Sequence, residues 1–167
     1  MVDEVAIGFD PGLATTGYGV VQATLRGWRV LAGGVIETPA NHPRADRLGT
    51  LSAEARELVD LYRPRGIAIE EVYFATNAKS AMRTAEARGA ILVAAAGFPV
   101  RGYTPLQVKK RITGYGRANK AQVQAMVKRL LALSETPKPD DMADALALAL
   151  CYLLDLRSPG GVDDVYV

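Results

Sequence analysis

Two predicted β-strands of this 167-residue chain each end in a carboxylate. Asp10 ends the apolar run 5–10, and Glu70 ends the apolar run 66–70. Because successive strand side chains alternate between two faces, each acid shares its face with small residues, which are Ala6, Gly8 and Ala68. A carboxylate so placed is costly to desolvate unless it is paired or bound to a metal ion. Both acids are candidate metal ligands, although a turn residue and an exposed strand end are the plainer interpretations.

Two more carboxylates, Asp141 and Asp144, stand three residues apart at the start of a predicted helix. Residues with this spacing share one face of a helix. Acids at a helix N-terminus also cap it and suit its dipole, so Asp140 or Asp141 needs no catalytic role. Asp144 differs, because it interrupts an otherwise apolar stretch.

Four converging carboxylates would repel one another strongly. At ~4 Å and an effective dielectric constant of ~20, each pair costs roughly 4 kcal/mol before screening. Divalent cations would relieve this repulsion, and oxygen ligands favour Mg²⁺ or Mn²⁺. The lone His42 is expected in a surface loop and the lone Cys151 in the core, so neither suggests a zinc site. Two ions ~3.5–4 Å apart could activate a water and stabilise the leaving oxygen of a phosphodiester.

The charge of the chain is unevenly distributed, although its net value is only +2. No acidic residue occurs between Glu86 and Glu135, a stretch that carries Arg88, Arg101, Lys109, Lys110, Arg111, Arg117, Lys120, Lys128 and Arg129. Clustered cations favour a polyanion through counterion release. Lys110 and Arg111 are candidate substrate contacts on this ground, while a solvated basic face explains the clustering equally well.

The apolar periodicity predicts an α/β fold with a mixed five-stranded sheet flanked by helices, an order that matches the ribonuclease H-like fold. Strands are expected at 5–10, 17–21, 28–36, 66–70 and 99–103, and helices at 43–62, 77–97, from about 119, and at 141–154. The stretch before residue 119 is expected to be a loop. One domain should span 1–157, followed by a flexible tail at 158–167.

The opening residues are too few and too acidic for a secretory signal, and no apolar run reaches the about 18–20 residues of a membrane span. A single cysteine excludes an internal disulfide. We therefore expect a cytoplasmic protein without a membrane partner.

Taken together, these residues resemble the RuvC family of Holliday junction resolvases, up to about residue 157. Short motifs in a fixed order carry the resemblance, namely 8–12 (GFDPG), 16–20 (TGYGV), 68–73 (AIEEVY) with Asn77, 87–89 (ARG), 107–109 (QVK), 120–123 (KAQV) and 141–147 (DMADALA). The resemblance implies a homodimer that binds four-way junction DNA and nicks two strands symmetrically with a divalent metal. It also implies the RuvA–RuvB branch-migration complex as a partner.

Position by position, the acids Asp10, Glu70, Asp141 and Asp144 match the metal-binding acids of the family. Glu71 falls on the opposite strand face from Glu70, so both parity and motif favour Glu70. Some members of the family have His at the position of Asp141, which makes this ligand the more replaceable one.

The resemblance also assigns residues that would touch DNA. Lys109 and Lys120 match lysines near the scissile phosphate. Tyr73 matches an aromatic residue that stacks on a base at the crossover, where stacking is worth ~1–3 kcal/mol; the adjacent Phe74 could take this role, and either could be a core residue. The alanine-rich helix from Asn77 is a candidate dimer interface, or it simply packs on the sheet.

Three other functions compete with this interpretation. A different ribonuclease H-like nuclease could act on other branched DNA or on RNA–DNA hybrids. An actin-like nucleotide-binding protein would need two related lobes, for which 167 residues are too few. A non-enzymatic DNA-binding module would leave the four carboxylates without a role.

Overall fold

The computed structural model describes residues 3–71 and 77–158, so Tyr73, Phe74 and the segment 159–167 lie outside its described part. One five-stranded mixed sheet forms its centre, with the strand order β3-β2-β1-β4-β5. The strands are β1 (Val5–Asp10), β2 (Thr15–Thr24), β3 (Gly27–Glu37), β4 (Gly66–Glu70) and β5 (Val100–Tyr103). The expected α/β class and mixed five-stranded sheet are confirmed.

The two acid-bearing strands, β1 and β4, are parallel neighbours in the middle of this sheet. Phe9 is paired with Ile69 in their register, so the next residue of each strand, Asp10 and Glu70, comes at the same edge of the sheet. On its other side β1 pairs antiparallel with β2, where Asp10 stands opposite Gly17. Strand pairing therefore sets the positions of both acids.

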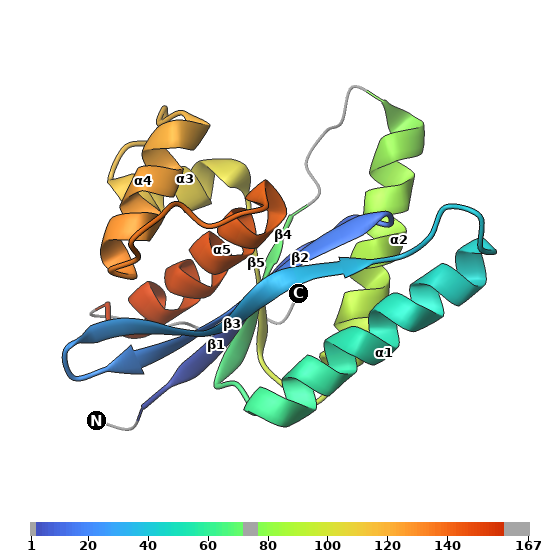
Figure 1. Ribbon diagram of the computed structural model, residues 1–167, viewed down its shortest axis with the longest axis horizontal. Helices are drawn as coiled ribbons and strands as arrows, with labels where there is room; N and C mark the ends of the chain where they lie inside the picture. The colour runs from blue at the N-terminus through green and yellow to red at the C-terminus, as the bar shows by residue number, and fades with distance from the viewer. Residues whose placement is uncertain (1–2, 72–76, 159–167) are drawn as a thin grey trace.

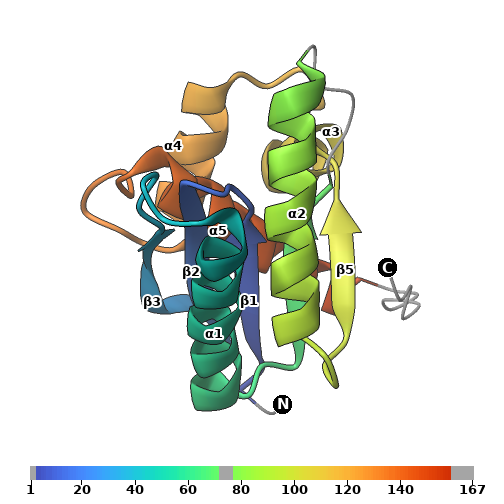
Figure 2. The same cartoon turned by 90° about the vertical axis from the view of Figure 1, so that its right-hand side faces the viewer.

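Helices cover both faces of the sheet (Figures 1 and 2). One face carries α1 (Arg44–Tyr62) and α2 (Ala78–Ala94), while the other carries α5 (Asp140–Leu156) with α3 (Pro105–Thr113) and α4 (Lys120–Leu130) packed beside it. No helix in the described ranges is long and apolar enough to cross a membrane. The alternation predicted for β1 and β4 is confirmed, since their large residues and their small residues join different core clusters.

Helix α5 lies unusually close to β1 and β2, because glycines face it. A Cβ atom built on Gly8 would lie 1.9 Å from the carbonyl oxygen of Ala145, and one built on Gly17 would lie 2.0 Å from that of Asp141. Both separations are far below van der Waals contact. The small residues beside Asp10 thus make room for α5, which brings Asp141 next to the strand position opposite Asp10.

Helix α3 corrects the expectation of a loop between β5 and α4. Thr104 accepts a hydrogen bond from the backbone N–H of Gln107, the Gln107 side chain accepts one from the backbone N–H of Thr104, and Pro105 occupies the first helical turn. This capping box with an N-terminal proline is a known start signal. The apolar periodicity does not predict this helix, because it has only nine residues and Ile112 is the only one that is fully buried.

Most other boundaries differ from expectation by a few residues: α2 ends at Ala94, and β2 and β3 are longer than predicted. The proposed domain end at residue 157 stays a prediction, because the segment 159–167 is outside the described residues.

Candidate active site

Asp10 and Glu70 interact directly across the ends of β1 and β4. Burial, followed by the charges of Glu70, Asp144 and Asp141 in that order, raises the pKa of Asp10 to about 8. Burial likewise raises the pKa of Glu70, followed by the charge of Asp144. The contact between the two carboxyl groups raises the pKa of Asp10 and lowers that of Glu70, so Asp10 is the acid of this pair that keeps its proton more readily.

Helix α5 supplies the other two carboxylates from its first two turns. The helix is capped by Pro139, and neither Asp140 nor Asp141 is its N-cap residue. Capping therefore does not account for Asp141, whose charge reaches Asp10. Burial raises the pKa of Asp144, while Lys120 opposes that rise. The charges of the four acids named from the sequence thus act on one another at a single place.

Lys120, at the start of α4, joins the site through two acids of α5. Its Nζ lies 3.3 Å from Asp144 Oδ2 and 3.0 Å from Asp140 Oδ2. Asp140 also accepts a hydrogen bond from Gln124 Nε2 at 3.1 Å. The hydrogen bond to Asp140 is the main cause that raises the pKa of Lys120, and the same contact lowers the pKa of Asp140.

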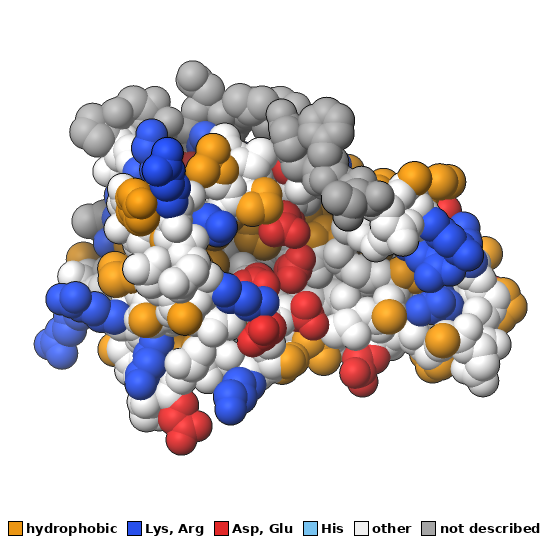
Figure 3. Space-filling model, turned by 90° about the horizontal axis from the view of Figure 1, so that it is seen from above, with side chains coloured by type: hydrophobic (Ala, Val, Ile, Leu, Met, Phe, Trp, Pro, Cys, Tyr) orange, Lys and Arg blue, Asp and Glu red, His pale blue; other side chains and the backbone are white. Residues whose placement is uncertain are grey.

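A pocket of about 200 Å³ opens between these side chains. Glu70 and Asp144 line it together with Lys109 and Lys120, and its remaining wall is apolar, from Pro105, Val108, Val123 and Leu148. Seen from above, acidic side chains gather in the middle of this face with basic side chains on both sides (Figure 3). The pocket therefore combines candidate metal ligands with cations suited to a phosphate.

The case for a metal site at this place rests on the chemistry of the side chains that could bind an ion. Within residues 3–71 and 77–158, no group of three or more His, Cys, Asp or Glu side chains is arranged to hold an ion as it stands. The raised pKa of Asp10 and the ion pair between Lys120 and Asp144 both reduce the repulsion among these acids. Buried, oxygen-only donors that repel one another fit Mg²⁺ or Mn²⁺.

The other candidate residues fall in different places. Glu71 lies on the opposite side of β4 from the site and pairs with Arg88 of α2 at 2.9 Å. Lys110 and Arg111 line a second hollow, on another side of α3 from Lys109. Tyr73 and Phe74 lie outside the described residues. His42 is exposed and Cys151 is buried, as expected.

Sequence reasoning missed the residues that hold the loop after Asp10. Arg47, in the first turn of α1, donates from Nε to Thr38 Oγ1 at 3.0 Å and from Nη2 to the Leu13 carbonyl oxygen at 3.3 Å. The Thr38 hydroxyl also donates to that carbonyl. No local motif announces this contact, because Arg47 and Leu13 are 34 positions apart.

Comparison with known proteins agrees with this geometry. The family described as crossover junction endodeoxyribonuclease RuvC matches residues 6–152. The protein of that name from Moorella thermoacetica is 49% identical over 148 residues, which are 87% of this chain and 89% of the relative.

Two solved structures are also similar over nearly the whole chain. Thermus thermophilus RuvC has a TM-score of 0.87 and 39% identity, covering 92% of this chain and 95% of its own. T. thermophilus RuvC in complex with a Holliday junction substrate has a TM-score of 0.86 and 40% identity, covering 90% and 93%. The expected ribonuclease H-like fold is thereby confirmed, and the chain belongs to the RuvC family of crossover junction endodeoxyribonucleases.

Proposed function

We infer that this chain resolves Holliday junctions in recombination and repair by nicking two strands symmetrically with divalent metal ions. The observation that carries this is a pocket lined by Glu70, Asp144 and two lysines, beside which the charges of Asp10 and Asp141 act on the same acids. A family member that is 40% identical was solved with a Holliday junction substrate, which supports the choice of DNA.

We assign metal binding to Asp10, Glu70, Asp141 and Asp144. Mg²⁺ or Mn²⁺ ions, two in each site, would activate a water molecule and stabilise the leaving oxygen of the phosphodiester. Asp10, whose pKa is raised, must release its proton for this, since metal ligands bind as carboxylates. Lys109 and Lys120, at the pocket wall, neutralise and orient the scissile phosphate. The apolar part of the wall keeps bulk water from these charges.

We propose that the protein acts as a homodimer through α2. Met82 and Val93 are 63% and 70% exposed on this helix, and their spacing of eleven residues is close to three full turns. Gly89 lies near the same line, and a Cβ there would meet nothing within 4 Å. The opposite side of α2 packs on α1 and on the sheet. The helix can therefore pack on the sheet and still offer an exposed face to a second copy of the chain. A twofold dimer matches the twofold symmetry of a junction.

The remaining expectations follow the family. Tyr73 or Phe74 would stack on a base at the junction centre, RuvA–RuvB would be the branch-migration partner, and the protein would act in the cytoplasm.

Replacing Asp10 with Asn tests the proposed chemistry. We expect Asp10→Asn to stop the cutting of a synthetic four-way junction in Mg²⁺ or Mn²⁺, by a factor of at least ~10², while junction binding persists. Asp60→Asn, on the exposed side of α1, is the matched control. Normal cutting by Asp10→Asn would mean that the active site is elsewhere.

Substrate choice is tested by offering four-way, linear duplex and RNA–DNA hybrid substrates side by side. Preference for the four-way junction supports the resolvase. Preference for the hybrid would favour a different ribonuclease H-like nuclease, even if Asp10 proved essential.

A further inference from the structure

Helix α3 separates two hollows, of which only one is lined by candidate metal-binding carboxylates, Glu70 and Asp144. Two sets of residues, each with the spacing i, i+3, i+4 of one helix face, line them: Pro105, Val108 and Lys109 line the carboxylate pocket, and Gln107, Lys110 and Arg111 line the second hollow. The second hollow has a volume of about 480 Å³ and lies between α3, β5 and the end of α5.

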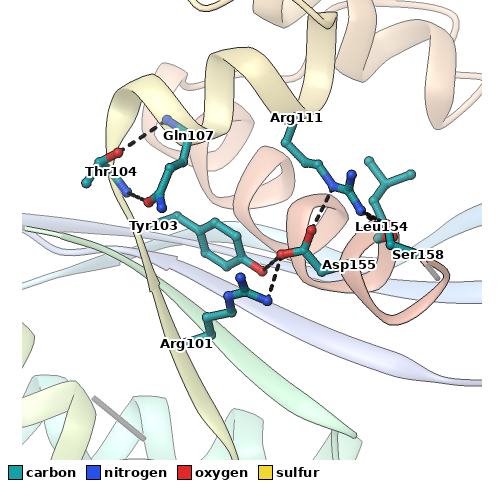
Figure 4. Close-up of polar contacts among 8 residues, drawn as sticks. All are labelled: Arg101, Tyr103, Thr104, Gln107, Arg111, Leu154, Asp155 and Ser158. Atoms are coloured by element: carbon teal, nitrogen blue, oxygen red, sulfur yellow. Dashed lines mark hydrogen bonds and ion pairs between the residues drawn. The ribbon is translucent and has the colours of Figure 1, made fainter. Parts of the chain in front are cut away.

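A half-buried carboxylate, Asp155, organises the second hollow (Figure 4). Its Oδ2 accepts a hydrogen bond from the Tyr103 hydroxyl at 2.7 Å and lies 3.0 Å from Arg101 Nη1. Its Oδ1 lies 2.7 Å from Arg111 Nε. Asp155 thus holds two guanidinium groups on either side of itself, and their side chains remain about one third exposed, at 31% and 34%.

The polar atoms left over in this hollow are donors. Both oxygens of Asp155 have partners, and the Gln107 Oε1 accepts from the backbone N–H of Thr104 at 2.8 Å. The Arg111 guanidinium is largely engaged, because its Nε is buried against Asp155 and its Nη2 donates to the Leu154 carbonyl oxygen at 2.6 Å and to the Ser158 hydroxyl. Lys110 forms no ion pair within the described ranges, and the amide nitrogen of Gln107 is likewise not engaged there.

The residues that line the second hollow carry a net positive charge, which suits a ligand that accepts hydrogen bonds. Three cations (Arg101, Lys110 and Arg111) face one carboxylate (Asp155), which leaves a formal charge of 3 − 1 = +2. Guanidinium groups in a fixed arrangement suit the oxygens of a phosphate. A ligand that brings only acceptors and negative charge fits these donors.

We propose that this hollow is a second phosphate-binding site, which holds a backbone phosphate of the same DNA that enters the carboxylate pocket. This proposal rests on the proposed function, because it takes junction DNA as the source of the phosphate. The two hollows lie on different sides of one helix, which is about 10 Å thick with its side chains. At a rise of about 3.4 Å per nucleotide, the second phosphate is roughly three nucleotides from the scissile one.

Lys110→Gln tests the site without disturbing Asp155. In an Asp10→Asn background with Mg²⁺, which prevents cutting, we expect weaker binding of a labelled four-way junction. A lost phosphate contact lowers the salt slope by ~0.9, so the ratio of variant to parent Kd should fall about 3-fold between 50 and 200 mM salt. Arg63→Gln is the matched control, because Arg63 is exposed and follows α1 at the end of the sheet away from Glu70.

Neutral methylphosphonates identify the DNA partner of the site. One such group is placed in turn at each position from two to five nucleotides from the cut. We expect it to weaken binding by the parent protein at one of these positions. At that position it should not weaken binding by Lys110→Gln any further. Equal, additive losses at every position would overturn the proposal, as would a Lys110→Gln variant that binds like Arg63→Gln. If the parent itself binds four-way and linear DNA equally, the proposed function fails instead.

Discussion

At the scale of single residues, the site is a set of buried carboxylates whose charges act on one another. Asp10 has the largest consequence, because its pKa of about 8 lies far above the ordinary value of ~3.9. Between these two pH values the folded protein retains a proton that the unfolded chain has released. The contribution of Asp10 to the free energy of unfolding is therefore complete below about pH 4 and is lost as the pH rises through 8.

Asp10→Asn should consequently stabilise the metal-free protein, and more so at higher pH. In EDTA we expect its Tm to match that of the parent near pH 4–5 and to exceed it by about 2–4 °C or more at pH 8, where 1 kcal/mol corresponds to ~2–4 °C for a domain of this size. Thermal unfolding at a series of pH values measures the difference. A Tm difference that does not change with pH would contradict the raised pKa.

The contact between Asp140 and Lys120 yields a second prediction at this scale. In Asp140→Asn, Lys120 keeps only Asp144 as a carboxylate partner, and Asp144 is a proposed metal ligand. We expect the Mg²⁺ concentration for half-maximal cutting to rise about 2- to 5-fold, the range expected for an exposed ion pair. Asp140→Glu should restore it. Asp60→Asn should leave the metal dependence unchanged, and so should Asp140→Asn if Asp140 is only a surface charge.

At the scale of elements, the site depends on how closely α5 approaches β1 and β2. Gly8 and Gly17 permit this approach, since a side chain at either position would overlap the backbone of α5. The strand pairing fixes Asp10 and Glu70, whereas this helix contact fixes Asp141 and Asp144. Two different packing interactions therefore build the two halves of the site.

Gly8→Ala should move the acids of α5 away from Asp10 and Glu70. We expect a loss of about 1–3 kcal/mol in the free energy of unfolding, because the added methyl group forces α5 outwards, together with a larger relative loss of cutting. Gly49→Ala is a matched control on the exposed side of α1, where nothing lies within 4 Å; it should gain up to ~1 kcal/mol from helix propensity. Denaturant unfolding and junction cutting measure both effects. If Gly8→Ala lost stability no more than Gly49→Ala, the close packing of α5 would be in doubt.

Strand alternation was sufficient to predict the faces of Asp10 and Glu70, because a strand end in a sheet leaves little freedom. The helix N-terminus likewise placed Asp141 and Asp144 on adjoining turns. The sequence could not predict that the neighbours Lys109 and Lys110 line different hollows. Their placement depends on α3, in which only Ile112 is fully buried. The pairing of Lys120 with Asp140 also depends on tertiary packing, which no local pattern records.

At the scale of the whole molecule, acids and cations come from different parts of the fold. The carboxylates belong to β1, β4 and α5, while the segment without acidic residues supplies β5, α3 and α4. The two parts meet at the carboxylate pocket, where both kinds of charge are present. A nearly neutral chain thus offers a polyanion a local basic surface beside the proposed metal-binding carboxylates.

Dimer formation is the prediction that belongs to this scale. Met82→Glu places a charge on the proposed α2 interface, and we expect at least ~10-fold weaker dimerisation, equivalent to ~1.4 kcal/mol. Sedimentation should show more monomer, and a cruciform plasmid should be nicked once instead of cut on both strands. Leu25→Glu is the control, since Leu25 is 82% exposed in the β2–β3 turn. An unchanged dimer with paired cutting would exclude α2 as the interface.

Helix α3 also limits how this fold can change its length. One residue inserted after Val108 would rotate the following residues by about 100°, which would turn Lys109 away from the carboxylates and towards the second hollow. An insertion of a whole turn would preserve the directions of Lys109 and Lys110, and an insertion between 114 and 119 would leave α3 itself unchanged. Among related sequences, insertions and deletions should therefore occur between α3 and α4, and the length of the nine-residue helix α3 should stay constant.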